Sequence, residues 1–207
     1  MTAAQRSSRT EGPRSKRKLI LDAAIDNFGK LGFEQTKWAT IADEVGIGQT
    51  ALYHYFESKV HCLLTIMSTE LERSLDRTRE VTAEVEDIRE AFHAAVVSAV
   101  TVSSNEALQA RILLSHQDLL VAPRLSEREE AERKRARELV REIESEWAGL
   151  LRRGMDAGVF PERDEKQMSR LVLGLLNSIW RWYRPSGRAS LAEVSTLVAD
   201  SCVRVVS

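Results

Sequence analysis

The sequence TKWATIADEVGIGQTALYHYFESK, residues 36 to 59, decides the fold of this chain. It predicts a first short helix that Thr36 can cap and that ends at Gly46, because glycine adopts a left-handed turn conformation at the least cost. A second short helix follows from about Gln49 to Phe56. The apolar positions of each helix share one face: Ile41, Ala42 and Val45 in the first, and Leu52, Tyr55 and Phe56 in the second.

The outer face of the second helix carries polar side chains. Two short helices joined by a tight glycine turn form the geometry that places a helix in the major groove of DNA. Gln49 and Thr50 stand at the N-terminal end, which enters the groove first, so we expect them to contact base edges. Tyr53 can donate its hydroxyl to a phosphate, and His54 can contact DNA or be merely exposed. Phosphate contacts are also predicted for Thr36, for Trp38, and for Lys59 at the start of the next helix. For Trp38, packing against the first helix of the chain is an equally good alternative.

This stretch resembles the DNA-binding signature of TetR-type transcriptional regulators. The matching residues are Gly46-Ile47, Leu52-Tyr53-His54-Tyr55-Phe56 and Ser58-Lys59, and the match extends over a preceding helix from about Arg14 to Phe33. Two positions depart from the family pattern. Gly48 replaces the usual capping serine, which predicts a weaker cap, and Gln49 replaces a frequent lysine, so an amide that can read adenine stands in place of a phosphate contact.

The resemblance implies an all-α fold of about nine helices in three parts. Residues 1–13 form a basic arm, residues 14–59 a three-helix DNA-binding unit with a helix-turn-helix, and residues 60–207 an effector-binding and dimerisation domain. The implied function is that of a homodimeric repressor on a palindromic double-stranded operator. A small effector releases the repressor from the operator by changing the spacing between the DNA-binding units of its two subunits. The alternatives are a regulator without a ligand, whose C-terminal core would be filled, and a helical enzyme or adaptor.

Composition supports a helical protein of the reduced cytoplasm. The 207 residues include four prolines and ten glycines, and 43% are hydrophobic. The first 18 residues hold six basic side chains against one acidic, so the N-terminal arm either reaches DNA or is a solubilising tail. Cys62 and Cys202 lie far apart in apolar helical contexts, which predicts buried, inert thiols. No stretch is apolar for the roughly 18 residues of a membrane span, so we expect no membrane contact.

The chain lacks the motifs of an enzyme. Its four histidines are scattered without metal-ligand spacing, and neither a phosphate-cradling glycine loop nor a G-x-S-x-G nucleophile elbow occurs. We therefore predict no catalytic residue, no metal site and no cofactor.

The C-terminal part predicts a succession of amphipathic helices. Their approximate ranges are 58–79, which can act as a lever, 86–103, 105–120, 126–157 with Ser126 as its cap, 168–183, and a last helix over the final residues.

The penultimate helix predicts a dimer contact. No charged residue occurs from Leu171 to Trp180, so this helix needs cover on all sides. One side can face its own bundle, and we expect the other to meet a second copy together with the last helix. Gly174 and Ser178, four residues apart, allow close approach, although a buried core helix would show the same pattern. The predicted interface residues are Leu171, Gly174, Leu175, Ser178, Leu191, Val194, Leu197 and Val198.

The same helix also points to an effector. Residues 175–185, LLNSIWRWYRP, with Gly187 after them, resemble the penultimate helix of a TetR branch that includes repressors of fatty-acid and steroid catabolism. Members of that branch respond to acyl-CoA thioesters, which implies an acyl-CoA or another bulky apolar carboxylic metabolite here. Arg181 and Arg184 can hold a phosphate or carboxylate near the mouth, or flank Pro185 in water.

The effector would need a cavity between the C-terminal helices. Apolar residues from several helices can line it or simply form the core. Asn177 stands in an apolar run and needs a partner, for which an internal hydrogen bond or the second subunit is favoured over a ligand. The predicted lining is Met67, Leu71, Phe92, Val96, Leu113, Trp147, Leu150, Leu176, Asn177 and Trp180.

Overall fold

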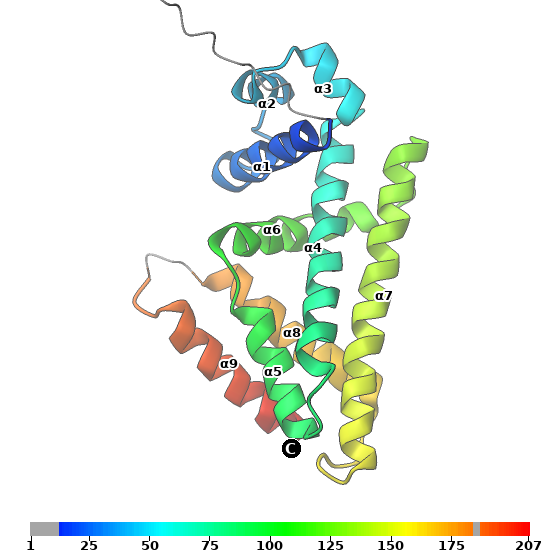
Figure 1. The fold of residues 1–207 in the computed structure, drawn as a ribbon, viewed down its shortest axis with the longest axis vertical. Coiled ribbons are helices and arrows are strands. Elements are labelled where there is room, and N and C mark those ends of the chain that lie inside the picture. The colour runs from blue at the N-terminus through cyan, green and yellow to red at the C-terminus, as the bar shows by residue number, and fades with distance from the viewer. Residues whose placement is uncertain (1–12, 184–186) are drawn as a thin grey trace, which may run out of the picture.

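The computed structural model describes residues 13–183 and 187–207, and the predicted basic arm lies almost entirely outside this part. Within it the chain is all helical, without a strand (Figure 1). The elements are α1 (Pro13–Leu31), α2 (Trp38–Val45), α3 (Gln49–Tyr55), α4 (Lys59–Thr82), α5 (Ile88–Val100), α6 (Ser104–Ser115), the 3-10 helix η1 (Gln117–Leu120), α7 (Glu127–Asp156), α8 (Glu165–Trp182) and α9 (Leu191–Val206).

The helices are arranged along one long axis. Helices α1, α2 and α3 gather at one end, and α4 runs from them down through the rest of the molecule with α7 at its side (Figure 1). Helices α5, α8 and α9 pack at the opposite end, and α6 crosses between them and α1. Helix α4 therefore connects the small N-terminal unit to the larger helical body.

The helix ends follow the local chemistry of the sequence. Ser126 accepts a hydrogen bond from the Glu129 amide and begins α7, as predicted. Gly46 ends α2 at φ 68°, in the left-handed conformation that was expected of it. Thr36 does not cap α2, because its hydroxyl donates to the Gly32 carbonyl at 2.8 Å and Lys37 takes the capping position without a side-chain bond. The predicted capping role of Thr36 is therefore wrong.

The helix predicted over residues 105–120 is interrupted. It ends at Ser115, and a separate 3-10 turn follows. The ring Nδ1 of His116 lies 2.9 Å from the Ile112 carbonyl, and the ring packs edge-on against Phe33 with centroids 5.3 Å apart. The His116 ring bonds to the Ile112 carbonyl, which would otherwise accept the backbone amide bond of the next helical turn. The helix therefore ends here.

A continuous apolar core runs through both parts of the molecule. Cys62 and Cys202 are buried in it as free thiols, as predicted. Burial raises the pKa of the Cys62 thiol well above its usual range and that of Cys202 to about 11. Among the helices that the structure describes, none is long and apolar enough to cross a membrane.

Candidate DNA-binding and effector sites

The first candidate site is the surface of the α2–turn–α3 unit. Buried side chains of Ile41, Leu52 and Phe56 hold the two short helices against the core. In the turn, the Gly46 amide donates to Asp43 at 3.1 Å and the Ile47 amide donates to Ala42 at 3.0 Å. These bonds satisfy the last carbonyls of α2 and set the angle at which α3 leaves the turn.

Helix α3 presents the predicted base-reading residues to solvent. Gln49, Thr50, Tyr53 and His54 are all exposed, and Tyr53 retains 46% of its accessible surface. Gly48 begins the helix and has no side chain to cap it, so the first amides of α3 are free to face a ligand. An exposed polar helix at the outer end of the molecule has the geometry required to enter a major groove (Figure 1).

The three residues predicted as additional phosphate contacts are placed differently. Thr36 is 2% exposed and bonds within the chain, and Trp38 packs edge-on against Phe56 with ring centroids 6.5 Å apart. The Lys59 ammonium donates to the carbonyl of Phe33 at 2.7 Å and to that of Thr36 at 3.1 Å. A phosphate contact by Lys59 would require these bonds to be given up, because its side chain ties the α1–α2 connection to the start of α4.

The second candidate site is a cavity of about 320 Å³ between α4, α5, α6, α7 and α8. Of the predicted lining residues, it brings together Leu71, Leu113, Trp147, Leu176, Asn177 and Trp180. The other four, Met67, Phe92, Val96 and Leu150, do not line it. They are core residues: Phe92, for example, is fully buried and packs edge-on against Trp147 and Phe160.

Asn177 lies at the exposed side of this cavity. The sequence predicted an internal hydrogen bond or a contact with a second subunit for its amide. In the folded chain Asn177 is exposed, so solvent can satisfy the amide. The neighbouring Gly174, predicted for the dimer contact, is exposed as well and lines the same cavity.

One wall of the cavity is polar, which the sequence did not indicate. Glu70 of α4 lines it and is 6% exposed. Burial raises the pKa of the Glu70 carboxyl to about 7, and the nearby charges of Arg73 and Arg77 oppose this shift. The carboxyl is 3.3 Å from an Arg73 nitrogen, the separation of a weak ion pair. A neutral, hydrogen-bonding acid therefore faces the cavity near and below neutral pH.

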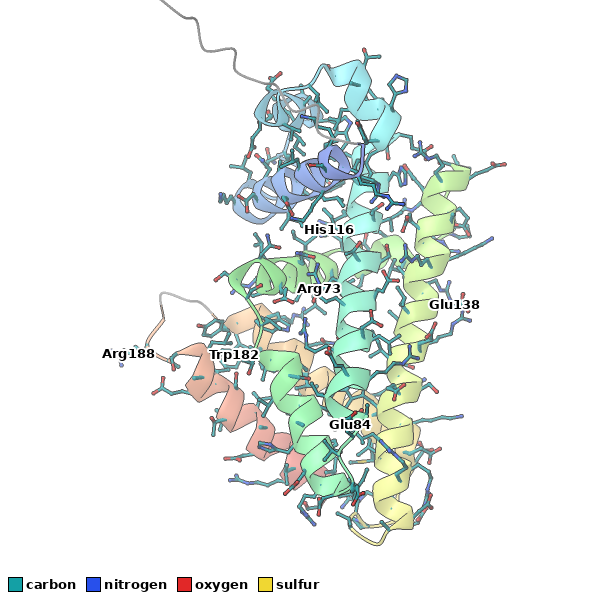
Figure 2. All side chains as sticks on the ribbon, in the orientation of Figure 1. Arg73, Glu84, His116, Glu138, Trp182 and Arg188 are labelled. Carbon is teal, nitrogen blue, oxygen red and sulfur yellow. The ribbon has the colours of Figure 1, made fainter. Side chains whose placement is uncertain are left out.

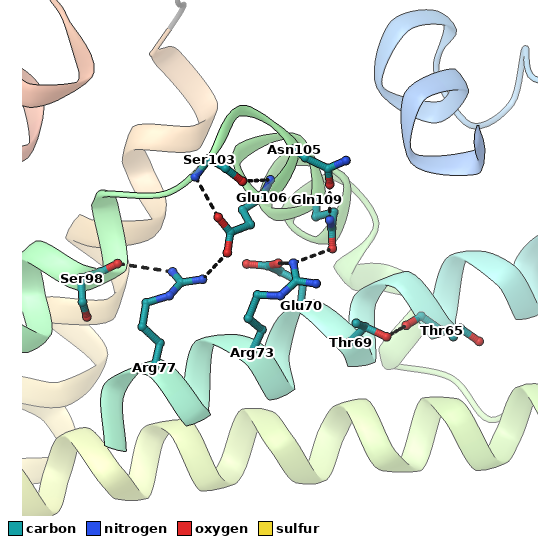
Figure 3. A network of polar contacts seen from close by, with 10 residues as sticks. All are labelled: Thr65, Thr69, Glu70, Arg73, Arg77, Ser98, Ser103, Asn105, Glu106 and Gln109. Carbon is teal, nitrogen blue, oxygen red and sulfur yellow. Dashed lines mark hydrogen bonds and ion pairs between the residues drawn. The ribbon is translucent and has the colours of Figure 1, made fainter. Parts of the chain in front are cut away.

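The two arginines also join α4 to α6 (Figure 3). Arg73 donates to the Gln109 amide oxygen at 3.3 Å, and Arg77 pairs with Glu106 at 2.8 Å. Arg77 donates in addition to the Ser98 carbonyl of α5 at 3.3 Å. The network makes α6 a fixed part of the cavity wall.

The far side of α6 contacts the DNA-binding unit. The Leu108 side chain lies so close to Gly29 of α1 that a Cβ at Gly29 would overlap it. At the end of α6, His116 packs on Phe33 (Figure 2 shows it between α6 and α1). A displacement of α6 by a molecule in the cavity would therefore act directly on α1.

The comparisons with known proteins agree with this arrangement. Residues 20–66 match the family described as bacterial regulatory proteins of the tetR family, and residues 85–206 match the tetracyclin repressor-like C-terminal domain. The chain belongs to the TetR family. The predicted helix-turn-helix fold and the predicted function as a DNA-binding transcriptional regulator are thereby confirmed.

Three relatives illustrate the similarity of this TetR-family chain to known regulators. The HTH-type transcriptional repressor KstR2 of Rhodococcus jostii (strain RHA1) is 29% identical over 191 residues, covering 90% of this chain and 88% of KstR2. The solved TetR-family regulator PfmR from Thermus thermophilus is 29% identical, with a TM-score of 0.77, and covers 89% of this chain and 97% of PfmR. FadR from Bacillus subtilis, solved in complex with stearoyl-CoA, is 18% identical with a TM-score of 0.72, covers 92% of this chain and 99% of FadR, and shows the shared fold.

The residues of the predicted dimer contact of this TetR-family chain differ in exposure and form three sets. Leu171 and Leu197 are 57% and 61% exposed, and Trp182, which the prediction omitted, is 52% exposed (Figure 2). Val194 and Val198 are buried within the chain at 3% and 8% exposure, so their assignment to a surface is wrong. They face α9's own bundle because apolar residues three and four apart fall on the inner side of that helix. Gly174 is exposed, whereas Leu175, Ser178 and Leu191 are half-buried at the margin of the exposed stripe.

Proposed function

We propose that this TetR-family chain is a homodimeric repressor that leaves its operator when an effector of the acyl-CoA class occupies the cavity. The observation that carries this proposal is the position of α6. One side of α6 lines the cavity, and its other side touches α1 of the DNA-binding unit. The cavity argues against a regulator without a ligand, for which a filled C-terminal core was predicted. KstR2 is named a repressor, and FadR was solved with stearoyl-CoA, which supports both parts of the proposal.

The release mechanism is geometric. Two copies of α3 must lie one helical turn of DNA apart, about 34 to 36 Å, to enter successive major grooves. A ligand that prefers a different position of α6 shifts α1 and changes that spacing. The coupling between the two sites is typically about 1 to 3 kcal/mol, which weakens operator binding about 5- to 150-fold.

On the DNA, we assign Gln49 and Thr50 to base edges, Tyr53 to a phosphate, and His54 to a phosphate or a base. Residues 14–59 act as the DNA-binding domain and residues 60–207 as the effector-binding and dimerisation domain. Helix α4 connects them, and three contacts reinforce the connection: Leu108 with Gly29, His116 with Phe33, and Ser58 with Glu129 of α7. A regulator of this design catalyses no reaction and works in the cytoplasm, where it meets the operator.

Substitutions on α3 test the DNA contacts. Tyr53→Phe should weaken binding about tenfold at every DNA sequence, because it removes a hydroxyl that donates to phosphate. Gln49→Ala should change the preference at one base-pair position by about 1 to 3 kcal/mol. The measurement is a fluorescence-anisotropy titration at fixed salt on the operator and on duplexes with single base-pair changes. Tyr55→Phe, on the half-buried side of the same helix, is the matched control. Unchanged affinity and preference in both variants would refute the assignment.

A further inference from the structure

We propose that Arg111 and Arg181 form an anion site at the rim of the cavity. The site would hold the carboxylate or phosphate of an amphipathic effector whose apolar part enters the cavity. This inference rests on the proposed function, because it assigns the polar end of the same effector. It names the residues that select an anionic ligand over a neutral one of equal apolar size.

The rim site is a surface pocket next to the effector cavity. It is lined by Arg111, Leu114 and Ser115 of α6 and by Trp180 and Arg181 of α8. Leu114 and Trp180 also line the cavity, so the two spaces share a wall. A ligand that passes this wall has its apolar part against Trp180 and its other end beside the arginines.

The lining of the rim pocket is cationic. Two guanidinium groups and one hydroxyl line it, and none of its lining residues is acidic. Arg111 donates through Nη2 to the Tyr183 carbonyl at 2.6 Å. Its Nε–H is buried and has no acceptor within the described ranges 13–183 and 187–207. A buried donor on a cation is costly to leave unpaired, and an anionic oxygen is the acceptor that stabilises it most.

The cavity itself favours a ligand with its anion outside. Its inner wall combines apolar residues such as Leu71 and Trp147 with the acidic side chains of Glu70 and Glu144, which do not attract an anion. Both arginines that line the cavity are already paired, Arg77 with Glu106 at 2.8 Å and Arg170 with Glu144 at 3.6 Å. An anionic group is therefore better placed at the rim than inside, and the rim arginines set its position.

The competing explanation for the position of Arg111 is a purely structural one, in which its only role is to bond to the end of α8. The Tyr183 carbonyl belongs to the C-terminal end of α8, where a cation is favourable without any ligand. The two roles make different predictions: loss of a structural bond weakens every ligand equally, whereas loss of an anion site weakens anionic ligands alone.

The experiment uses four probes with a ten-carbon chain: decanoate, decyl phosphate, decanoyl-CoA and the neutral methyl decanoate. Isothermal titration calorimetry measures the dissociation constant of each with the full chain and with Arg111→Gln and Arg181→Gln. Arg163→Gln is the matched control, because Arg163 also donates to a backbone carbonyl in the last turn of a helix, that of Val205, but lines neither pocket. Thermal unfolding of each variant checks that it is folded.

We expect Arg111→Gln to weaken an anionic probe about 10- to 100-fold and to leave methyl decanoate within about twofold. Arg181→Gln should act in the same direction with a smaller factor, since this side chain is exposed. A loss for decanoate identifies a carboxylate as the group held, and a loss confined to decyl phosphate and decanoyl-CoA identifies a phosphate.

Two results would overturn the anion site: an equal loss for anionic and neutral probes, or anionic binding that Arg111→Gln leaves unchanged. Absence of binding by every anionic probe to the natural chain would also overturn it. In the first two cases, operator binding that decanoyl-CoA or another CoA thioester releases would leave the proposed function standing. Failure of the natural chain to bind any specific DNA would instead refute the proposed function.

Discussion

Replacing Leu171 and Leu197 together by aspartate is expected to convert the protein to monomers and to weaken operator binding by at least about 100-fold. Both side chains are more than half exposed and lie on the α8–α9 surface that we assign to the dimer. A two-fold interface contains each substitution twice, so the double variant places four carboxylates in an apolar contact, at a cost of several kcal/mol. A monomer binds only one half-site of the operator. It therefore loses the affinity that a dimer gains because its second DNA-binding unit is held close to the second half-site.

Sedimentation velocity measures the oligomeric state, and fluorescence anisotropy measures the operator affinity. Leu125→Asp is the control, because Leu125 is also an exposed leucine but lies in the loop before α7, outside the predicted contact. The variant monomer should remain folded, since Val194 and Val198 still pack in its own bundle. A double variant that stays dimeric would place the subunit interface elsewhere on the molecule.

Replacing Glu70 by glutamine is expected to stabilise the protein at pH 8 and to leave it almost unchanged at pH 4.5. The folded-state pKa of Glu70 is about 7 against an ordinary value of 4.5, because the carboxyl is buried beside the cavity. The folded chain therefore binds more protons than the unfolded chain between these two values, and the free energy of unfolding falls as the pH rises through that window. The contribution of this one group is on the order of 3 kcal/mol and is fully lost above about pH 7.

Urea unfolding at pH 4.5, 6 and 8 measures this effect. Glutamine keeps the shape and a hydrogen-bonding oxygen for Arg73 but cannot ionise, so the variant should lack this decline in the free energy of unfolding with pH. Glu80→Gln, on an exposed position of the same helix, is the control and should retain the decline. Parallel pH profiles for Glu70→Gln and the natural chain would show that the pKa of the Glu70 carboxyl is the same in the folded and the unfolded chain, which would contradict its burial-raised value.

The DNA-binding unit could be predicted closely because its signals are local. The turn at Gly46 needs a left-handed residue, and the apolar spacing around Leu52 and Phe56 determines which face of α3 is buried. What remains on α3 is the exposed face that carries Gln49 and Tyr53. These inferences need only residues within one or two helical turns of each other.

The cavity could be predicted only in part because helical spacing identifies an apolar face and not its neighbour. Leu71 and Met67 stand four apart on α4, yet Leu71 lines the cavity and Met67 is sealed in the core. Glu70 was missed for the converse reason. A charged residue in a helix ordinarily indicates a solvated face, and the burial of Glu70 results from the packing of other helices, α6 among them, against α4.

The contact between α6 and α1 had no signal in the sequence. Gly29 and Leu108 are distant in the chain, and the glycine is needed only because the leucine of another helix occupies its Cβ position. In the rim pocket, Arg181 was expected near the mouth of the cavity, but its neighbour Arg111 comes from another helix and had no such signal. Long-range contacts of this kind carry the proposed coupling, and they are visible only after the fold is known.

The central claim is that specific operator binding and effector occupancy exclude each other. The most direct test is an anisotropy titration, at fixed salt, on the DNA upstream of this gene and on duplexes selected from a random pool. The titration is repeated with a panel of CoA thioesters and their free acids. We predict a specific complex on an inverted repeat that at least one thioester weakens about 5- to 150-fold. Failure to enrich any sequence would contradict the DNA-binding claim, and a specific complex that no panel member weakens would contradict release by an acyl-CoA effector.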